Sequence, residues 1–179
     1  MDLATVGTDV EKIIATEEQL QSRIAELAAQ VDSDYKDKNV LLVGVLKGAI
    51  MAMADLTRAM QTHIEMDWMA VSSYGSGTKS SGVVRILKDL DRDITGRNVL
   101  IIEDIVDTGI TIDKVIKLLT IQEPSSIEVC ATLFKKEAYR GQHPPKYFGF
   151  EIPNKFVVGY GLDYDQYGRN LPAIYQVKS

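Results

Sequence analysis

Short apolar runs alternate with amphipathic stretches along the chain. Val40–Val45 and Val99–Ile102 are apolar throughout, which is typical of strands buried on both faces of a sheet. Apolar residues at helical spacing follow each run, and a further helical stripe precedes the first run. The three stripes are Leu20, Ile24, Leu27, Ala28 and Val31, then Met51, Met53, Leu56 and Met60, and finally Ile112, Val115, Ile116 and Leu119. This alternation predicts an α/β fold with a mostly parallel sheet and helices on both faces.

Other patterns predict five more strands. These cover Asp9–Ile14, His63–Val71, Val83–Leu87, Ile127–Phe134 and Phe156–Tyr160. In His63–Val71 the residues on one face are Ile64, Met66, Trp68 and Ala70. Ser72–Ser81 is polar and glycine-rich between two alternating strands, which predicts a hairpin with a mobile loop. Lys135–Lys155 is expected to be loop-rich, because its three prolines exclude a regular sheet. Thr16–Gln19 has the capping-box pattern of a helix start.

Composition and charge limit the kinds of function that fit this chain. At 179 residues we expect one domain, residues 1–179. The formal charge of −5 gives no general basic field for nucleic acid. The single cysteine, Cys130, cannot form an internal disulfide, which suits a reducing cytoplasm. No apolar run approaches the ~20 residues of a membrane span, and the N-terminus does not resemble a signal peptide. We therefore expect a cytoplasmic protein that binds neither nucleic acid nor membrane.

The most informative chemistry follows the apolar run Val99–Ile102. The polar residues there are Glu103, Asp104, Asp107, Thr108, Gly109 and Thr111. Ligands of open α/β sheets bind beyond the carboxyl ends of the strands, and a helix start attracts anions, so the threonines and the glycine fit a phosphate. The carboxylates would repel that phosphate unless they bind sugar hydroxyls or Mg²⁺. An acidic helix cap is the simpler alternative. Three carboxylates, two threonines and a glycine in this short stretch favour a site.

Lys47 and Gly48 occupy the equivalent place after Val40–Val45. A cation beside a helix start is unfavourable unless an anion lies between them, which favours an anion site over a solvated surface lysine. A nucleotide P-loop is a poorer interpretation of the polar stretch 75–80 (GSGTKS). That stretch contains no Gly-Lys-Ser/Thr, and Ser80 stands where the motif G-x-G-x-x-G requires its third glycine.

These residues resemble the signature of type I phosphoribosyltransferases, in which a hydrophobic strand, an acidic pair and a Thr/Ser-Gly-rich loop bind 5-phosphoribosyl 1-diphosphate. Phe150–Pro172 is similar to the base-binding segment of the hypoxanthine-guanine branch of that family. The resemblance extends from about Asp9 to the C-terminus. It implies the family fold, with a small hood formed by the N- and C-terminal segments. It also implies purine salvage, in which the phosphoribosyl group is transferred to hypoxanthine or guanine, giving IMP or GMP and diphosphate.

The resemblance assigns the base end of the site as follows. Asp107 would be the catalytic base that accepts the purine proton at N7. Lys135 would bind the purine O6 and, because an ammonium only donates hydrogen bonds, would select 6-oxopurines over adenine. Phe156 would stack on the purine, and Val157 would present backbone groups to its edge.

The resemblance also assigns the sugar and diphosphate ends. The 5′-phosphate would be bound by Thr108, Gly109 and Thr111, the ribose hydroxyls by Glu103 and Asp104, and the diphosphate by Lys47, Gly48 and Arg169. Ser73 and Tyr74 would fold over the diphosphate. The cofactor would be Mg²⁺, with Glu103, Asp104 and Asp163 as its ligands. A non-proline cis peptide before Lys47 is also typical of the family.

Three points stay open in the sequence. A regulatory module that binds 5-phosphoribosyl 1-diphosphate and controls transcription or RNA could share this fold, because fold alone does not determine function. An enzyme restricted to xanthine or to hypoxanthine is the second alternative, since Lys135 and Phe156 do not rank the 6-oxopurines. The resemblance implies a homodimer or homotetramer without deciding between them.

Overall fold

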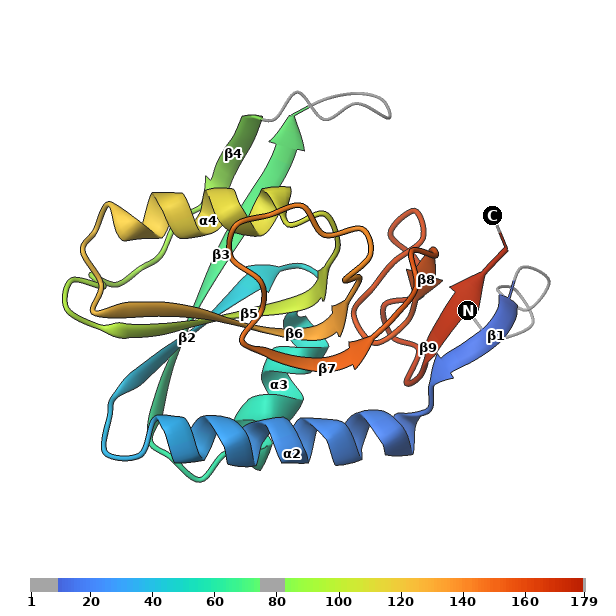
Figure 1. Ribbon diagram of the computed structural model, residues 1–179, viewed down its shortest axis with the longest axis horizontal. Coiled ribbons are helices and arrows are strands. Elements are labelled where there is room, and N and C mark those ends of the chain that lie inside the picture. The colour runs from blue at the N-terminus through green and yellow to red at the C-terminus, as the bar shows by residue number, and fades with distance from the viewer. Residues whose placement is uncertain (1–9, 75–82, 179) are drawn as a thin grey trace.

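Two β-sheets organise the structure, a computed structural model that describes residues 10–74 and 83–178 (Figure 1). The larger sheet has six strands in the order β4-β3-β2-β5-β6-β7, and the smaller has three in the order β1-β9-β8. In the larger sheet every pair of neighbours is parallel except β3 and β4. Its strands are β2 (Val40–Leu46), β3 (Ile64–Tyr74), β4 (Val83–Lys88), β5 (Asn98–Val106), β6 (Ser126–Phe134) and β7 (Tyr147–Glu151). The predicted α/β fold with a mostly parallel sheet is confirmed.

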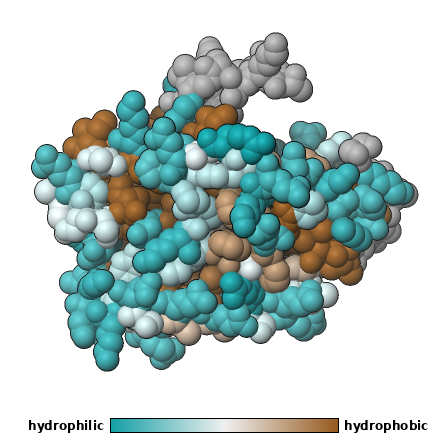
Figure 2. Space-filling view, viewed as in Figure 1, coloured by the Kyte–Doolittle hydropathy of each residue, from teal (hydrophilic) through white to brown (hydrophobic). Residues whose placement is uncertain are grey.

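The helices of the described residues cover both faces of the larger sheet, as predicted. α2 (Glu17–Asp34) and α3 (Ile50–Ala59) lie on one face, and α4 (Ile110–Thr120) lies on the other (Figure 1). The core divides in the same way, because the apolar side chains of α2 and α3 pack in one cluster and those of α4 in another. In the same view, hydrophilic residues cover the edge formed by α2 (Figure 2). None of the helices in the described ranges is long and apolar enough to cross a membrane.

The smaller sheet joins both ends of the described chain, and we call it the hood. It contains β1 (Val10–Ala15), β8 (Val157–Val158) and β9 (Ile174–Val177), all antiparallel. The hood implied by the family resemblance is therefore present. The strand expected at Phe156–Tyr160 is only two residues long, because Gly159 has a φ of 106° and turns the chain. β9 was not predicted from the sequence.

Thr16 connects the hood to α2 as a helix cap. Its hydroxyl oxygen accepts the Gln19 N–H at 3.2 Å, and the Gln19 side chain accepts the Thr16 N–H at 2.9 Å. The predicted capping box is thus confirmed. We expect Thr16→Ala to lower the free energy of unfolding by about 1 kcal/mol, and Thr16→Ser to preserve it. Urea denaturation followed by circular dichroism measures both, and equal midpoints for the two variants would contradict this role.

β3 and β4 form the predicted hairpin. β3 extends to Tyr74 and so includes the first residues of the expected loop, while residues 75–82 lie outside the described residues. Trp68 packs against the core on one face of β3, but Met66 on the same face is 52% exposed. The opposite face carries the buried residues Asp67 and Met69.

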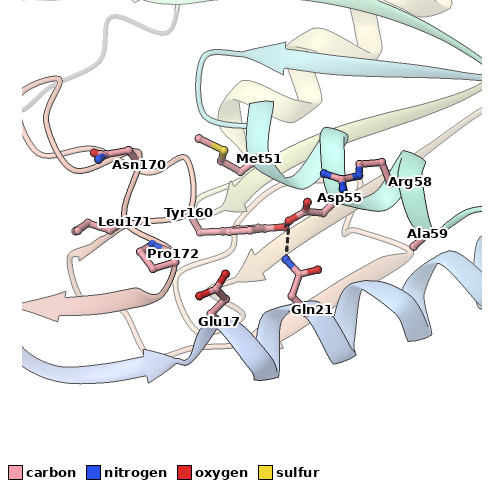
Figure 3. Close-up of a pocket in the computed structure, with 10 residues that line it drawn as sticks. All are labelled: Glu17, Gln21, Met51, Asp55, Arg58, Ala59, Tyr160, Asn170, Leu171 and Pro172. Carbon is pink, nitrogen blue, oxygen red and sulfur yellow. Dashed lines mark hydrogen bonds between the residues drawn. The ribbon is translucent and has the colours of Figure 1, made fainter.

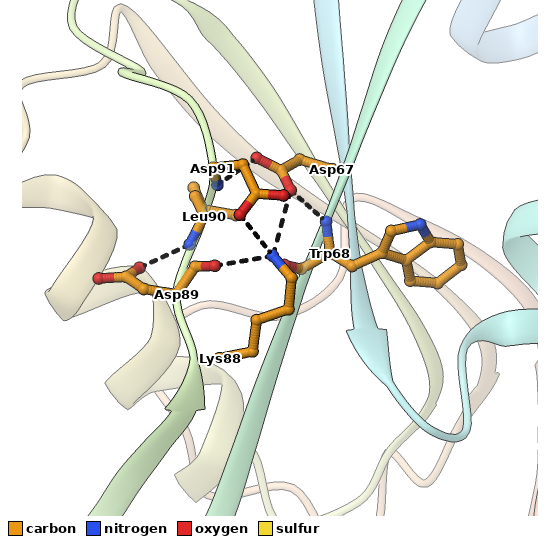
Figure 4. Close-up of polar contacts among 6 residues, drawn as sticks. All are labelled: Asp67, Trp68, Lys88, Asp89, Leu90 and Asp91. Atoms are coloured by element: carbon orange, nitrogen blue, oxygen red, sulfur yellow. Dashed lines mark hydrogen bonds and ion pairs between the residues drawn. The ribbon is translucent and has the colours of Figure 1, made fainter.

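Asp67 is a buried carboxylate with a structural role. Its two oxygens accept the backbone N–H groups of Trp68 at 2.7 Å and Asp91 at 2.8 Å. The Lys88 ammonium lies 3.7 Å from the same carboxylate and donates to the Trp68 carbonyl oxygen at 2.9 Å (Figure 4). These bonds hold the segment that follows β4 against β3. They also give each oxygen of the buried Asp67 carboxylate a hydrogen-bond donor.

The prediction that prolines exclude a regular sheet from the loop-rich segment Lys135–Lys155 is wrong, because β7 lies within it. β7 pairs in parallel with β6 at the edge of the sheet. The three prolines flank this strand instead of interrupting it, with Pro144 and Pro145 before it and Pro153 after it. A short strand between such residues needs no ladder hydrogen bond from a proline nitrogen.

Candidate active site

The carboxyl ends of the parallel strands meet at one edge of the larger sheet. β2 leads through α3 to β3 on one side, whereas β5 leads through α4 to β6 on the other. The chain therefore leaves the neighbouring strands β2 and β5 in opposite directions, with the two helices on opposite faces (Figure 1). Open α/β sheets bind ligands at such a topological switch point. Lys47 follows β2 directly, and Asp107 follows β5 directly.

Glu103 and Asp104 lie inside β5, which corrects the prediction that they follow the strand. β5 continues to Val106 because it remains paired with β6, although its ladder with β2 ends at Ile102. Successive side chains of a strand point to opposite faces. Glu103 lines a cavity with the loop after β5, whereas Asp104 lies against Gly48. The acidic pair is therefore divided between the two sides of the crevice.

Gly48 allows three segments to approach one another. A Cβ at position 48 would overlap the Asp104 carboxylate, and a Cβ at Gly161 would overlap the Gly48 carbonyl oxygen. The peptide bond between Leu46 and Lys47 is cis, as the family resemblance implied. The ends of β2 and β5 and the chain of the hood thus meet around Gly48.

The two carboxyls in β5 lie in surroundings that disfavour their charged forms. Burial raises the pKa of Glu103, and the Asp104 charge raises it further. Burial also raises the pKa of Asp104 to about 6, against the opposing hydrogen bond from the Ile105 N–H and the positive charge of Arg169. A cation bound between these carboxyls and a ligand would lower both pKa values and offset the loss of hydration. The donor chemistry therefore fits a divalent cation.

The described residues contain no group of three carboxylate, imidazole or thiol side chains placed to hold a metal ion alone. Mg²⁺ usually binds through one or two carboxylates together with substrate phosphates and water. The site therefore fits Mg²⁺ as part of a complex with a ligand. Asp163 is not free for this role in the structure, because both of its carboxylate oxygens have partners. Oδ1 lies 2.8 Å from the Arg169 guanidinium, and Oδ2 accepts the Gln166 N–H at 2.7 Å.

The loop Thr108–Thr111, which we call the phosphate loop, opens a cavity at the start of α4. The cavity has a volume of about 220 Å³, and its lining includes Glu103, Asp107 and the two threonines. The residue that caps α4 is Gly109, with a φ of 84°, and no side chain makes a capping hydrogen bond there. The alternative that the carboxylates simply cap this helix is therefore wrong. The helix start can offer its N–H groups to an anion.

Asp107 and Lys135 form an ion pair at the ends of β5 and β6. The Lys135 ammonium donates to Asp107 Oδ2 at 2.7 Å, and the Lys135 N–H donates to the Val106 carbonyl oxygen at 2.9 Å. The Lys135 side chain is 9% exposed, whereas that of Asp107 is 42% exposed. The parallel register of the two strands brings together two residues that are 28 positions apart. Asp107 is thus positioned by a buried cation while it faces solvent.

The family model for the phosphoribosyl transferase domain matches residues 12–165, which is most of the chain. The chain belongs to this phosphoribosyltransferase family. It is 49% identical to a hypoxanthine-guanine phosphoribosyltransferase of Mycobacterium tuberculosis, over 94% of this chain and 90% of that protein. It is 46% identical to the protein of the same name in Bacillus subtilis, over 93% and 92% of the two chains. The crystal structure of a hypoxanthine phosphoribosyltransferase from Staphylococcus aureus matches with a TM-score of 0.93 at 43% identity, covering 97% of this chain and 95% of that one.

The remaining predicted residues of this phosphoribosyltransferase lie at β8 of the hood and at the end of β3. Phe156 is 47% exposed, and its ring makes an edge contact with Tyr164 at a centroid distance of 5.7 Å. Val157 is buried in β8. Ser73 and Tyr74 end β3, and the loop that they were predicted to begin lies outside the described residues.

Lys47 has a partner that the sequence did not predict. Its ammonium donates to the Gln166 side-chain oxygen at 3.0 Å. Gln166 lies in a two-residue turn with Asp165, and the positive φ of both residues is typical of a type I′ hairpin. Lys47 and Arg169 line one cavity of about 470 Å³, whereas Asp107 lines the phosphate-loop cavity. No local sequence pattern signals the Gln166 contact.

A larger cavity of about 590 Å³ lies away from these residues, between α2, α3 and the chain near the hood (Figure 3). Asp55 in its wall accepts hydrogen bonds from Gln21 at 2.9 Å and Tyr160 at 2.7 Å, both on the same oxygen. Its lining contains none of the predicted site residues. Charged residues predicted for the site line the two smaller cavities at the strand ends and not this larger space.

Proposed function

We propose that this phosphoribosyltransferase transfers the 5-phosphoribosyl group of 5-phosphoribosyl 1-diphosphate to N9 of hypoxanthine or guanine, giving IMP or GMP and diphosphate. The observation that carries this proposal is the 2.7 Å pair between Asp107 and Lys135 beside the phosphate-loop cavity. The Asp107 carboxylate could accept a proton from a purine, and the Lys135 ammonium could bind the carbonyl oxygen of the same base. The names of the curated relatives support the same activity.

At the base end, Lys135 would donate to the purine O6 and thereby favour 6-oxopurines over adenine, whose 6-amino group is itself a donor. This hydrogen bond would draw the ammonium toward the base and leave Asp107 ready to accept the N7 proton. Phe156 has an exposed ring that could stack on the purine. Val157 would offer backbone groups to the purine edge.

At the sugar end, the phosphate loop would hold the 5′-phosphate with the hydroxyls of Thr108 and Thr111 and with N–H groups at Gly109 and beyond. Glu103 and Asp104 would bind the ribose hydroxyls from opposite faces of β5. Breaking the bond at the anomeric carbon develops positive charge on the sugar, as in glycoside cleavage. The two carboxyls would stabilise that charge electrostatically.

At the diphosphate end, Lys47 and Arg169 would bind the leaving group, and the backbone at Gly48 would approach it closely. Mg²⁺, when bound to the substrate complex, would supply charge that stabilises the leaving diphosphate. Glu103, Asp104 and Asp163 are the proposed ligands, and Asp163 would have to exchange its Arg169 contact to take part. Ser73 and Tyr74 would close over the diphosphate and exclude water.

We propose that residues 1–179 form one catalytic domain, because both parts of the structure contribute to the site. Phe156 and Arg169 lie in the chain that flanks β8 of the hood, while Asp107 and Lys135 directly follow strands of the larger sheet. The partners would be the two small-molecule substrates, with no nucleic acid and no membrane, in the cytoplasm. A homodimer or homotetramer is proposed, and light scattering during size-exclusion chromatography measures which one forms.

Steady-state turnover with hypoxanthine, guanine, xanthine and adenine, each with and without Mg²⁺, tests the activity. We expect IMP and GMP to form in the presence of Mg²⁺ and adenine to be rejected. A folded protein that forms neither nucleotide would overturn the proposal. Filter binding with DNA and RNA beside this assay tests the alternative of a regulatory module.

Lys135→Met should lower kcat/KM for hypoxanthine and guanine by roughly 10- to 100-fold, because one charged hydrogen bond to the substrate is lost. Methionine keeps the apolar stem of the side chain, so the fold should be retained. The matched control is Lys136→Met, since the neighbouring Lys136 side chain is 68% exposed and lies 3.9 Å from Glu151. Parallel kinetics measure both variants, and equal losses would remove Lys135 from the base site.

A further inference from the structure

The phosphate loop rests on a second segment of chain, residues 139–143, which we call the brace. The Arg140 N–H donates to the Thr108 carbonyl oxygen at 2.9 Å. A Cβ at Gly109 would overlap the Tyr139 ring and would lie 3.0 Å from the Gly141 Cα. The brace therefore contacts the phosphate loop at two successive residues, Thr108 and Gly109.

One side chain, Asp113, fastens the brace to α4. Its carboxylate accepts the Gln142 N–H at 2.8 Å and the His143 N–H at 3.1 Å, and it lies 2.9 Å from His143 Nδ1. A Cβ at Gly141 would lie 2.9 Å from Asp113 Oδ2 and 2.7 Å from the Tyr139 hydroxyl oxygen, so little room is left for the brace to shift. The fit is close on both sides of the brace.

These contacts form a closed circuit. The phosphate loop leads into α4, the first turn of α4 carries Asp113, Asp113 holds the brace, and the brace returns to the phosphate loop through Arg140 and Tyr139. The helix dipole is by itself enough to stabilise a carboxylate in the first turn of a helix. Its bonds to Gln142 and His143, 29 and 30 residues away, are not required for that effect.

We propose that Asp113 is a positioning residue for phosphoribosyl transfer, which fixes the phosphate loop in the conformation that binds the 5′-phosphate by holding the brace against it. The inference rests on the proposed function of that loop. Asp113 directs its carboxylate at the brace, so its contribution to binding passes through Arg140, Tyr139 and Gly109. Backbone donors bind an anion best when they are fixed before it arrives.

The test compares Asp113→Ala, Asp113→Asn and the wild type. We expect Asp113→Ala to raise the KM for 5-phosphoribosyl 1-diphosphate and the Kd for IMP by roughly tenfold, because the brace loses its charged acceptor. The KM for hypoxanthine and the Kd for inosine, which lacks the 5′-phosphate, should change less than about twofold. Asp113→Asn keeps one acceptor oxygen and the same shape, so its values should fall between the other two.

Asp93→Ala is the matched control. Asp93 accepts the Thr95 N–H at 2.9 Å and the Thr95 hydroxyl at 2.7 Å in the turn before β5, at the opposite edge of the sheet. Asp93→Ala therefore removes carboxylate hydrogen bonds comparable to those of Asp113, but in another loop. Hydrogen exchange without substrate gives a readout that is independent of activity. The amides of residues 108–112 should exchange faster in Asp113→Ala than in the wild type, and their exchange rates should be unchanged in Asp93→Ala.

The outcomes separate the two proposals. Faster exchange together with a selective loss of IMP over inosine supports the positioning role. Unchanged exchange, equal losses for IMP and inosine, or the same kinetic loss in Asp93→Ala overturns it. If Asp113→Ala does not fold, the same criteria apply to Asp113→Asn. A wild type that forms no IMP refutes the proposed function, while the exchange data still decide whether Asp113 holds the loop.

Discussion

Asp107→Asn should lower kcat by about 10²- to 10⁴-fold, which is the usual contribution of a general base. An amide has nearly the same shape as a carboxylate and can still accept the Lys135 hydrogen bond, now 2.7 Å long, but it cannot accept the N7 proton. The Kd for IMP should therefore stay within a few-fold of the wild-type value. Single-turnover kinetics and nucleotide titration measure the two effects separately.

The control for this loss is Asp37→Asn. Asp37 is an exposed aspartate with a positive φ of 61° in the turn before β2, at the edge of the sheet opposite the site. Asp37→Asn removes one negative charge from the chain, as Asp107→Asn does, and asparagine tolerates the positive φ at this position. Its turnover should equal that of the wild type. If Asp107→Asn also kept near-wild-type kcat, the base would have to be another group.

The meeting of Asp107 and Lys135 at one edge could be anticipated, although their ion pair was not predicted. Lys135 directly follows a strand that is evident in the sequence, and Asp107 stands a few residues beyond another. Parallel neighbours end at the same edge, so residues at their carboxyl ends converge whatever lies between them. The same reasoning placed Lys47 at this edge. The order of the strands, and with it the switch point between β2 and β5, is known only from the structure.

The division of Glu103 and Asp104 between two faces was not predicted, although side chains of a strand always alternate. The apolar run suggested that the strand stopped at Ile102. It continues to Val106 only because β6 remains paired with it, and that pairing depends on a segment some 30 residues away. A strand end set by a distant partner leaves no local pattern.

The contacts of Gln166 and the brace were missed for the same reason. Gln166 reaches Lys47 across 119 positions, and Asp113 reaches the brace across about 30. Each lies in irregular chain, where neither the period of a helix nor that of a strand applies. β7 was not predicted because the prolines of its segment disfavour a strand only at their own positions, and all three stand outside β7.

Gly48→Ala should lower kcat/KM by about 10²-fold, the size of effect that a misplacement of about 1 Å at a reacting centre produces. The new Cβ would overlap the Asp104 carboxylate, which can rotate away, so the chain should still fold while the carboxylate leaves the crevice. Kinetics in the Asp104→Ala background test this route, because Gly48→Ala should lower kcat/KM much less once the carboxylate is absent.

Gly96→Ala is the control, since no atom lies within 4 Å of a Cβ at Gly96 and only its φ of 69° opposes alanine. That variant should lose some stability but no turnover. Equal losses from Gly48→Ala with and without Asp104 would mean that the glycine acts through the backbone at Lys47 instead.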